Sequence, residues 1–129
     1  MPSVFTKIIN GDIPSYKIAE NDSFYAFLDI NPLVKGHTLV VPKVEIDYLF
    51  DLDDQTLQDM MLFAKSVAVK IKEAIPCKRI GVSVIGLEVP HAHIHLVPLT
   101  NMADINFSGP KLALSVEELK VVQDLIIKV

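Results

Sequence analysis

The segment Pro90-His91-Ala92-His93-Ile94-His95-Leu96-Val97-Pro98 (PHAHIHLVP) decides the fold, because histidine and apolar residues alternate along it. Successive side chains of a β-strand point to opposite faces of the sheet. If the segment is extended, its three histidines therefore share one face, while Ala92, Ile94 and Leu96 enter the core on the other. Helical geometry would scatter the rings. The alternation predicts a strand with a histidine face.

Rings on such a face would stand about 6 to 7 Å apart, close enough to converge on one small group. Histidine can act as proton donor or acceptor, nucleophile or metal ligand. Protonated rings repel each other, and a bound phosphate-like anion would relieve the repulsion. A metal is the alternative, with His95 or His37 as a third ligand and Glu88 or Glu45 in support. Spacing alone leaves both open.

The composition predicts a single globular domain over residues 1–129, since 50% of the residues are hydrophobic and 22% are charged. The formal net charge is −4 and the sequence pI is near 5.5. Lys and Arg are scattered along the chain, so its field would repel a phosphodiester backbone. We therefore expect no nucleic-acid polymer as a partner.

Cys77 is the only cysteine, so the chain can form no disulfide within itself, which favours a reducing compartment. Lys7 interrupts the apolar residues near the amino terminus, and no signal-peptide core is visible. No apolar run approaches the roughly 20 residues of a membrane span. We expect a soluble cytoplasmic protein with no membrane partner.

Local patterns predict the remaining elements. They are a short helix capped by Ser3, a hairpin turning at Asn21-Asp22, a strand over 37–42, an amphipathic helix over about 53–75, a strand over 79–89 apolar on both faces, and a final helix with a Ser115–Glu118 capping box. Apolar residues on both faces predict a strand covered on each side. The order of elements argues for the α+β class with a mostly antiparallel sheet.

Three ordered segments resemble the histidine triad (HIT) superfamily. They are VFTKIINGDIPSYKI (4–18), FYAFLDINPLVKGHTLVVPK (24–43) and HAHIHLV (91–97), which matches the pattern His-φ-His-φ-His-φ-φ with φ apolar. The resemblance runs from about residue 4 to residue 99. With His95 rather than glutamine in the third position, the chain is most similar to the small nucleoside phosphoramidate hydrolases.

That resemblance implies a HIT-like sheet of about five strands with one long helix and short terminal helices. It implies a homodimer, substrates that are purine nucleoside monophosphate derivatives, and chemistry with no metal or other cofactor. His93 would be the nucleophile that forms a covalent nucleotidyl-imidazole, and His91 would orient it. His95 and His37 would contact phosphate oxygens or the leaving group.

The resemblance also implies a nucleoside site. Asp29 matches the acceptor for the ribose hydroxyls, and Phe5, Ile8, Phe27 and Ile30 match the apolar walls around the base. From the residues alone, Asp29 would be a solvated residue at a strand end.

Two departures bear on catalysis. Glu88 stands where the superfamily commonly has Ser or Thr, three residues before the triad, and a carboxylate there would repel phosphate. Val82-Ser83-Val84 and Gly86-Leu87 replace the usual amide side chains of the preceding strand and loop. Glu88 is therefore a nucleotide-site residue of unsettled role.

Three functions follow from these patterns. The first is a nucleotide hydrolase, acting as a purine nucleoside phosphoramidase or nucleotidyl hydrolase through a covalent intermediate. The second is a nucleotide-binding regulatory protein with weak or no catalysis, its activity blunted by Glu88. The third is a metal-binding histidine cluster.

Overall fold

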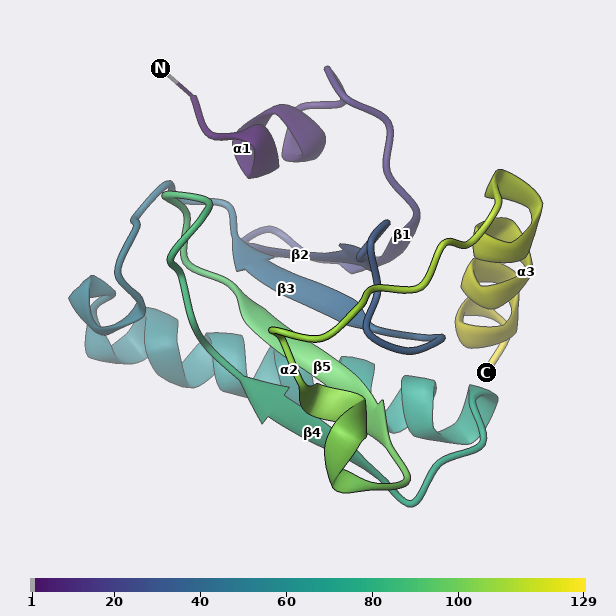
Figure 1. Cartoon of the computed structure of the whole chain (residues 1–129). Helices are drawn as coiled ribbons and strands as arrows, with labels where there is room; N and C mark the ends of the chain where they lie inside the picture. Colours follow the sequence, from purple (N-terminus) through teal and green to yellow (C-terminus); the bar gives the residue numbers. More distant parts are fainter. Residues whose placement is uncertain (1) are drawn as a thin grey trace.

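A computed structural model of the chain describes residues 2–129 and shows an antiparallel five-stranded sheet in the order β1-β2-β3-β5-β4 (Figure 1). The elements are α1 (Val4–Ile9), β1 (Lys17–Glu20), β2 (Phe24–Leu28), β3 (Thr38–Pro42), η1 (Leu49–Asp51), α2 (Asp54–Ala74), β4 (Arg79–Ser83), β5 (Ile94–Leu99), η2 (Met102–Ile105) and α3 (Val116–Ile127). The predicted α+β class is confirmed. None of the helices between residues 2 and 129 has the length and hydrophobicity that a bilayer crossing requires.

The two faces of the sheet carry different apolar clusters. On one face, Ala26, Val40 and Ile94 pack against α2, which brings Met60 and Val67 to the same core. Adjacent strand residues point the other way, where a smaller cluster gathers around α1. Figure 1 shows α2 behind the sheet, and the chain between η2 and α3 crossing its opposite face. The histidine face therefore lies on the side that α2 leaves free.

The predicted helix starts and hairpin turn are confirmed by their hydrogen bonds. The Ser3 hydroxyl accepts from the Thr6 N–H at 3.1 Å. Ser115 and Glu118 cap each other reciprocally, with two bonds of 3.1 Å. In the hairpin turn, the Asn21 carboxamide oxygen accepts hydrogen bonds from the backbone N–H groups of Ser23 and Phe24, where β2 begins. Short-range signals thus place these boundaries correctly.

A strand forms in the predicted stretch 79–89, but the prediction that it is covered on both sides is wrong. β4 ends at Ser83, pairs only with β5 and forms the sheet edge. Val82 is 53% exposed and Leu87 is 87% exposed. An apolar run has the same sequence appearance in an edge strand as in a central one, so its neighbours in space decide its burial.

The histidine segment has the predicted faces, although it joins the sheet later than expected. β5 begins at Ile94, so residues 91–93 precede the paired strand. Ala92, Ile94 and Leu96 nevertheless all enter the core under α2. The predicted alternation is confirmed.

Gly36 sets the entry into β3 and therefore the position of the adjacent His37. Its φ is +95°, a conformation that residues with a Cβ rarely adopt. A Cβ here would also lie 3.0 Å from Ile75 Cγ1 and 3.1 Å from Pro98 Cγ. The turn before His37 therefore requires glycine both for its backbone and for its space.

We predict that Gly36→Ala destabilises the fold by about 2 to 3 kcal/mol, the sum of left-handed backbone strain and crowding against Ile75 and Pro98. Gly11→Ala is the matched control, because Gly11 has φ +83° with no atom within 4 Å of the added Cβ. It should cost only the backbone share, about 1 to 2 kcal/mol. Denaturant unfolding of both variants measures the difference, and equal losses would refute the steric part.

Candidate active site

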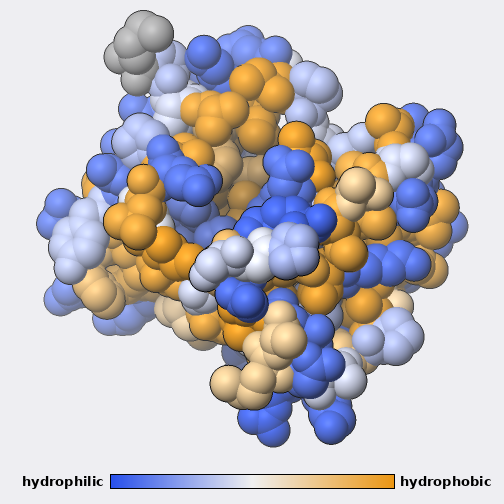
Figure 2. All heavy atoms as spheres, in the orientation of Figure 1, coloured by the Kyte–Doolittle hydropathy of each residue, from blue (hydrophilic) through white to orange (hydrophobic). Residues whose placement is uncertain are grey.

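A cavity of about 340 Å³ opens on the sheet face opposite α2, beside the histidine segment. In the surface view, hydrophobic residues gather around a hollow below α1 (Figure 2). Six of the ten residues expected at the site line this cavity: Phe5, Asp29, His37, Glu88, His93 and His95. The fold thus brings most of the expected set together from the amino-terminal helix, the β2–β3 region and the triad.

The other four expected residues do not line the cavity. Phe27 lies behind Phe5, with ring centroids 5.5 Å apart, and Ile8 packs against the same cluster. His91 is fully buried beneath the site. Ile30 is 60% exposed and lies outside the cavity. Of the four apolar residues expected around the base, only Phe5 lines the cavity.

His91 is held from both ring nitrogens. Its Nε2 lies 2.7 Å from the carbonyl oxygen of Pro42, which can only accept, so the proton is on Nε2. Its Nδ1 then accepts from the Ser3 hydroxyl at 2.7 Å. Glu45 accepts from the Ser3 N–H and the Thr6 hydroxyl, both at 2.6 Å. Glu45 thus anchors α1 to the triad, and does not support a metal ligand.

The pKa of His91 lies below its usual value, chiefly because burial disfavours the charged ring. This direction agrees with the hydrogen bonds, which use one ring nitrogen as donor and the other as acceptor. His91 is therefore a neutral structural support for its neighbours.

His93 has one nitrogen bonded to the backbone and one facing the cavity. Its Nδ1 lies 2.7 Å from the carbonyl oxygen of His91, so in the neutral ring Nδ1 carries the proton and Nε2 keeps its lone pair. Within residues 2–129, no hydrogen bond reaches His93 Nε2. The edge-on ring of Phe5, 5.0 Å away, limits its rotation. The arrangement leaves an unprotonated, cavity-lining nitrogen suited to nucleophilic attack.

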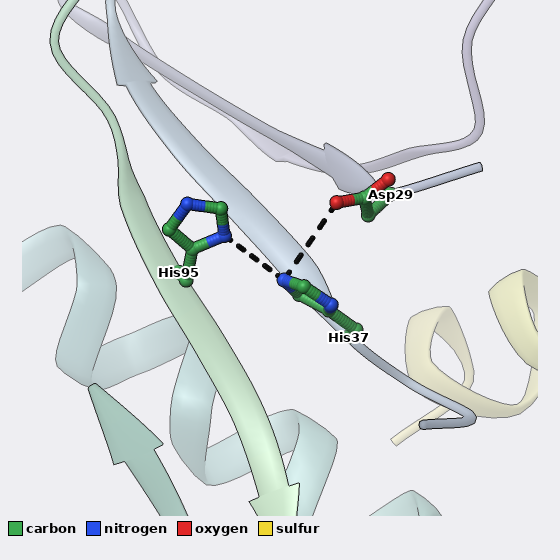
Figure 3. A group of neighbouring side chains, drawn as sticks. All are labelled: Asp29, His37 and His95. Atoms are coloured by element: carbon green, nitrogen blue, oxygen red, sulfur yellow. Dashed lines mark hydrogen bonds and ion pairs between the residues drawn. The ribbon is translucent and has the colours of Figure 1, made fainter. Parts of the chain in front are cut away.

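His37, just before β3, and His95 on the adjacent β5 form a hydrogen-bonded pair. The Leu33 N–H donates to His37 Nδ1 at 3.0 Å, which places the proton of the neutral ring on Nε2. That Nε2–H donates to His95 Nδ1 at 3.0 Å. The proton of His95 is therefore on its Nε2, on the side of the ring away from His37 (Figure 3). The His95 Nε2–H is therefore the free hydrogen-bond donor of this pair.

Both rings are neutral near pH 7. Burial lowers the pKa of His37 to about 4 and that of His95 to about 3, and neighbouring positive charges lower both further. The expectation that the triad attracts anions by carrying positive charge therefore does not hold for these two rings. They can offer hydrogen bonds to an anion, but no charge.

Asp29, His37 and His95 form the one group of potential metal ligands found within residues 2–129, with ligand atoms all within 4.8 Å of one another (Figure 3). Asp29 Oδ2 lies 3.7 Å from His37 Nε2. A metal at His37 Nε2 would have to displace the ring proton, because Nδ1 already accepts from Leu33. Burial raises the pKa of Asp29, which also weakens it as an anionic ligand. The protons present suit an anion better than a cation.

Phe107 and Lys111 are among the cavity residues that the sequence analysis missed. The ring of Phe107 lies edge-on to His95 with centroids 4.7 Å apart, and Lys111 also lines the cavity. Both belong to the segment after η2, for which the sequence analysis predicts no helix or strand. No periodicity or motif marks them, because their role depends on the path that the chain takes back across the sheet.

Comparison with known proteins identifies the family of this chain. A family model described as the HIT domain matches residues 10–102. Adenosine 5'-monophosphoramidase hnt1 of Schizosaccharomyces pombe is 34% identical over 126 residues, covering 93% of this chain and 92% of that protein. Adenosine 5'-monophosphoramidase HNT1 of Saccharomyces cerevisiae is 40% identical over 96 residues, covering 74% of this chain and 61% of that protein.

Solved structures agree. A Hit-like protein from Bartonella henselae has a TM-score of 0.85 at 30% identity, covering 98% of this chain and 94% of that one. A Zn-bound histidine triad family protein from Mycobacterium smegmatis has a TM-score of 0.80 at 27% identity, covering 97% and 93%. From its motifs, its fold and these similarities, the chain belongs to the HIT family.

Proposed function

We propose that this protein is a nucleotide hydrolase, a purine nucleoside phosphoramidase or nucleotidyl hydrolase that acts through a covalent nucleotidyl-His93 intermediate. The observation that carries the proposal is His93 itself, whose Nδ1–H is fixed on the His91 carbonyl while Nε2 is left unprotonated at the cavity. The adenosine 5'-monophosphoramidases among its relatives support the substrate class.

The reaction has two displacements at the α-phosphorus. His93 Nε2 forms a bond to phosphorus as the P–N bond of the phosphoramidate breaks, and the leaving nitrogen keeps the electron pair and takes a proton. A water oxygen then attacks phosphorus, the bond to Nε2 breaks, and the water releases a proton. The His91 carbonyl stabilises the positive charge that the His93 ring acquires in between.

His95 Nε2–H would donate to a phosphate oxygen, and His37 would hold His95 in the tautomer that can do so. Asp29 would accept from the ribose hydroxyls, and Phe5 would pack against the base with Phe27 and Ile8 behind it. Ile30, outside the cavity and exposed in the free protein, would join the base site only by contact with a bound base.

The proposed chemistry needs no metal, because His93 is itself the nucleophile and His95 supplies a neutral donor. The proton on His37 Nε2 supports this. We place the protein in the cytoplasm, on the ground that its single cysteine allows no internal disulfide.

The second candidate is a nucleotide-binding regulatory protein with weak turnover, and Glu88 is the observation that favours it. Glu88 lines the cavity together with Asp29, so two acidic side chains face the space that a phosphate would occupy. A carboxylate that close would repel phosphate and the charge of the transition state.

We also propose a homodimer joined through β4. This strand is the sheet edge, its outer backbone groups are open to pairing, and Val82, Val84 and Ile85 are all exposed beside it. An exposed apolar edge strand favours pairing with another strand. A second copy of β4 would extend the sheet across a two-fold axis.

His93→Ala should lower turnover of adenosine 5'-phosphoramidate by about 10³-fold or more, because it removes the nucleophile. Affinity for AMP should change little, since His93 is not needed to hold the nucleoside. Turnover assays and calorimetric titration measure the two effects. Full turnover in His93→Ala would end the covalent mechanism.

Glu88→Ser decides between the two candidates. If the protein is an enzyme slowed by Glu88, this variant should raise kcat several-fold with AMP affinity raised or unchanged. If wild type and Glu88→Ser both bind AMP but neither turns over a panel of adenosine phosphoramidates and phosphoanhydrides, the regulatory role replaces the catalytic one.

The stability of the fold should fall as the pH drops from 6.5 to 5. Above pH 6.5, His37 and His95 are neutral in both the folded and unfolded states, so neither makes the free energy of unfolding depend on pH. Below it, the unfolded chain binds protons that the folded chain, with pKa values of about 4 and about 3, does not. Each ring then lowers the free energy of unfolding by at most about 1.4 kcal/mol per pH unit.

Denaturant unfolding at several pH values tests this. His95→Asn should make the dependence on pH shallower over that range, whatever its effect on stability at pH 7. An unchanged slope would show that His95 is protonated in the folded protein.

For the dimer, we expect light scattering to give twice the chain mass, and Val82→Lys to shift the protein toward monomer by placing like charges across the two-fold axis. Val121→Lys on α3 is the matched control, since Val121 is 54% exposed and Val82 is 53% exposed. A monomeric wild type, or dissociation by the α3 variant alone, would contradict the β4 interface.

A further inference from the structure

The charge around the proposed phosphate site is unbalanced unless Lys111 is included. Asp29 and Glu88 both line the cavity, and Lys111 is the only Lys or Arg that does so within residues 2–129. The hydrogen bonds already assigned leave His37 and His95 neutral. A nucleoside monophosphate would therefore bring negative charge to a cavity in which His37 and His95 carry no charge of their own to meet it.

We propose that Lys111 is a phosphate-binding residue, which supplies the fixed positive charge that the cavity needs for a nucleoside 5'-phosphate. This inference rests on the proposed nucleotide site, and it adds a residue from outside the triad and the matched family region, which ends at residue 102. Lys111 would offset Glu88 and Asp29, so that the cavity accepts phosphate despite its two carboxylates.

The chain after η2 is built to hold Lys111 at the cavity. Phe107 packs against the rings of His95 and His37, with centroids 4.7 and 6.0 Å away. Beyond Lys111, the Leu112 N–H donates to the Pro32 carbonyl at 2.8 Å. The segment is thus held on both sides of Lys111, by the two histidine rings and by the β2–β3 connection. Figure 1 shows this stretch crossing the face of the sheet toward α3.

In the free protein the Lys111 ammonium group is bound only to main-chain carbonyls of its own loop. Its Nζ donates to the Phe107 carbonyl at 2.7 Å and to the Gly109 carbonyl at 3.4 Å. No carboxylate neutralises it, since it forms no salt bridge among the described residues. An ammonium group has three donors and turns freely on its stem, so a phosphate oxygen can replace the weaker carbonyl contact.

The positive charge of Lys111 already reaches the site. It lowers the pKa of His37, of His95 and of Asp29, although burial is the larger influence on all three. The charge of one ammonium group thus affects His95 on β5, His37 just before β3 and Asp29 just after β2. A phosphate placed among them would sense it too.

The test compares AMP with adenosine, which share the base and ribose but differ in the phosphate. Lys111→Met should weaken AMP binding about tenfold, the scale of one charge-assisted hydrogen bond, and leave adenosine binding unchanged. Lys111→Arg should keep AMP affinity near wild type. Lys65→Met is the matched control, because Lys65 is an exposed lysine on α2, away from the cavity. Titration calorimetry at two salt concentrations measures all four proteins.

Lys111→Gln separates charge from loop structure, because glutamine can still donate to the Phe107 carbonyl. We expect it to lose AMP affinity as Lys111→Met does, and to weaken the dependence of AMP binding on salt. Wild-type AMP affinity in Lys111→Met or Lys111→Gln would overturn the assignment, as would an equal loss for AMP and adenosine. If the wild type neither binds AMP nor cleaves adenosine 5'-phosphoramidate, the proposed function itself fails, which is a distinct result.

Discussion

The hydrogen bond from His93 Nδ1–H to the carbonyl of His91, 2.7 Å long, is the interaction on which the site depends. A carbonyl cannot donate, so this bond alone decides which nitrogen of His93 is protonated and which carries a lone pair. The carbonyl is itself held in place, because the His91 ring is bonded to Pro42 on one side and Ser3 on the other. Pro42 on β3 and Ser3 at the start of α1 thus position the His91 carbonyl, and that carbonyl determines which nitrogen of His93 is free to react.

The same reasoning gives every buried histidine a defined tautomer. Backbone groups of Leu33, Pro42 and His91 act as fixed donors or acceptors, and the protons of the rings arrange themselves accordingly. Because burial disfavours the imidazolium forms of His37, His91 and His95, these three rings provide directional hydrogen bonds without positive charge. These rings would orient a phosphate by hydrogen bonds, but they would not balance its negative charge, which requires a cationic side chain such as Lys111. This division of work is why a lysine outside the triad matters to the proposed chemistry.

Sheet position explains where the molecule is rigid and where it is open. β3 and β5 lie side by side within the sheet, so His37 and His95 are held by two paired strands against a core. β4 and the segment after it are exposed, and they carry Glu88 toward the cavity with few packing partners. The departures from the family pattern fall on this open side. Variation there can change substrate choice without disturbing the tautomers, since no bond of the buried histidines involves residues 82–88.

Features that depend on near neighbours in the chain could be read from the sequence. The alternation from His91 to His95 identified the core face and the histidine face, since strand geometry repeats every two residues. Ser3, Ser115 and the long apolar repeat likewise located three helices through caps and helical periodicity. Six of the ten expected site residues line one cavity: Phe5 lies on α1, His95 lies on β5, and the other four lie in segments that adjoin the strands.

What only the tertiary structure decided concerns contacts between distant parts of the chain. The exposure of Val82 depends on β4 being an edge, which no local pattern encodes. The protons of His91 and His37 depend on bonds to backbone groups brought close by folding. Phe107 and Lys111 reach the cavity only because the chain returns across the sheet after η2. Local sequence determines conformation and faces, whereas charge balance at a site depends on which side chains the whole fold places within a few ångströms of one another.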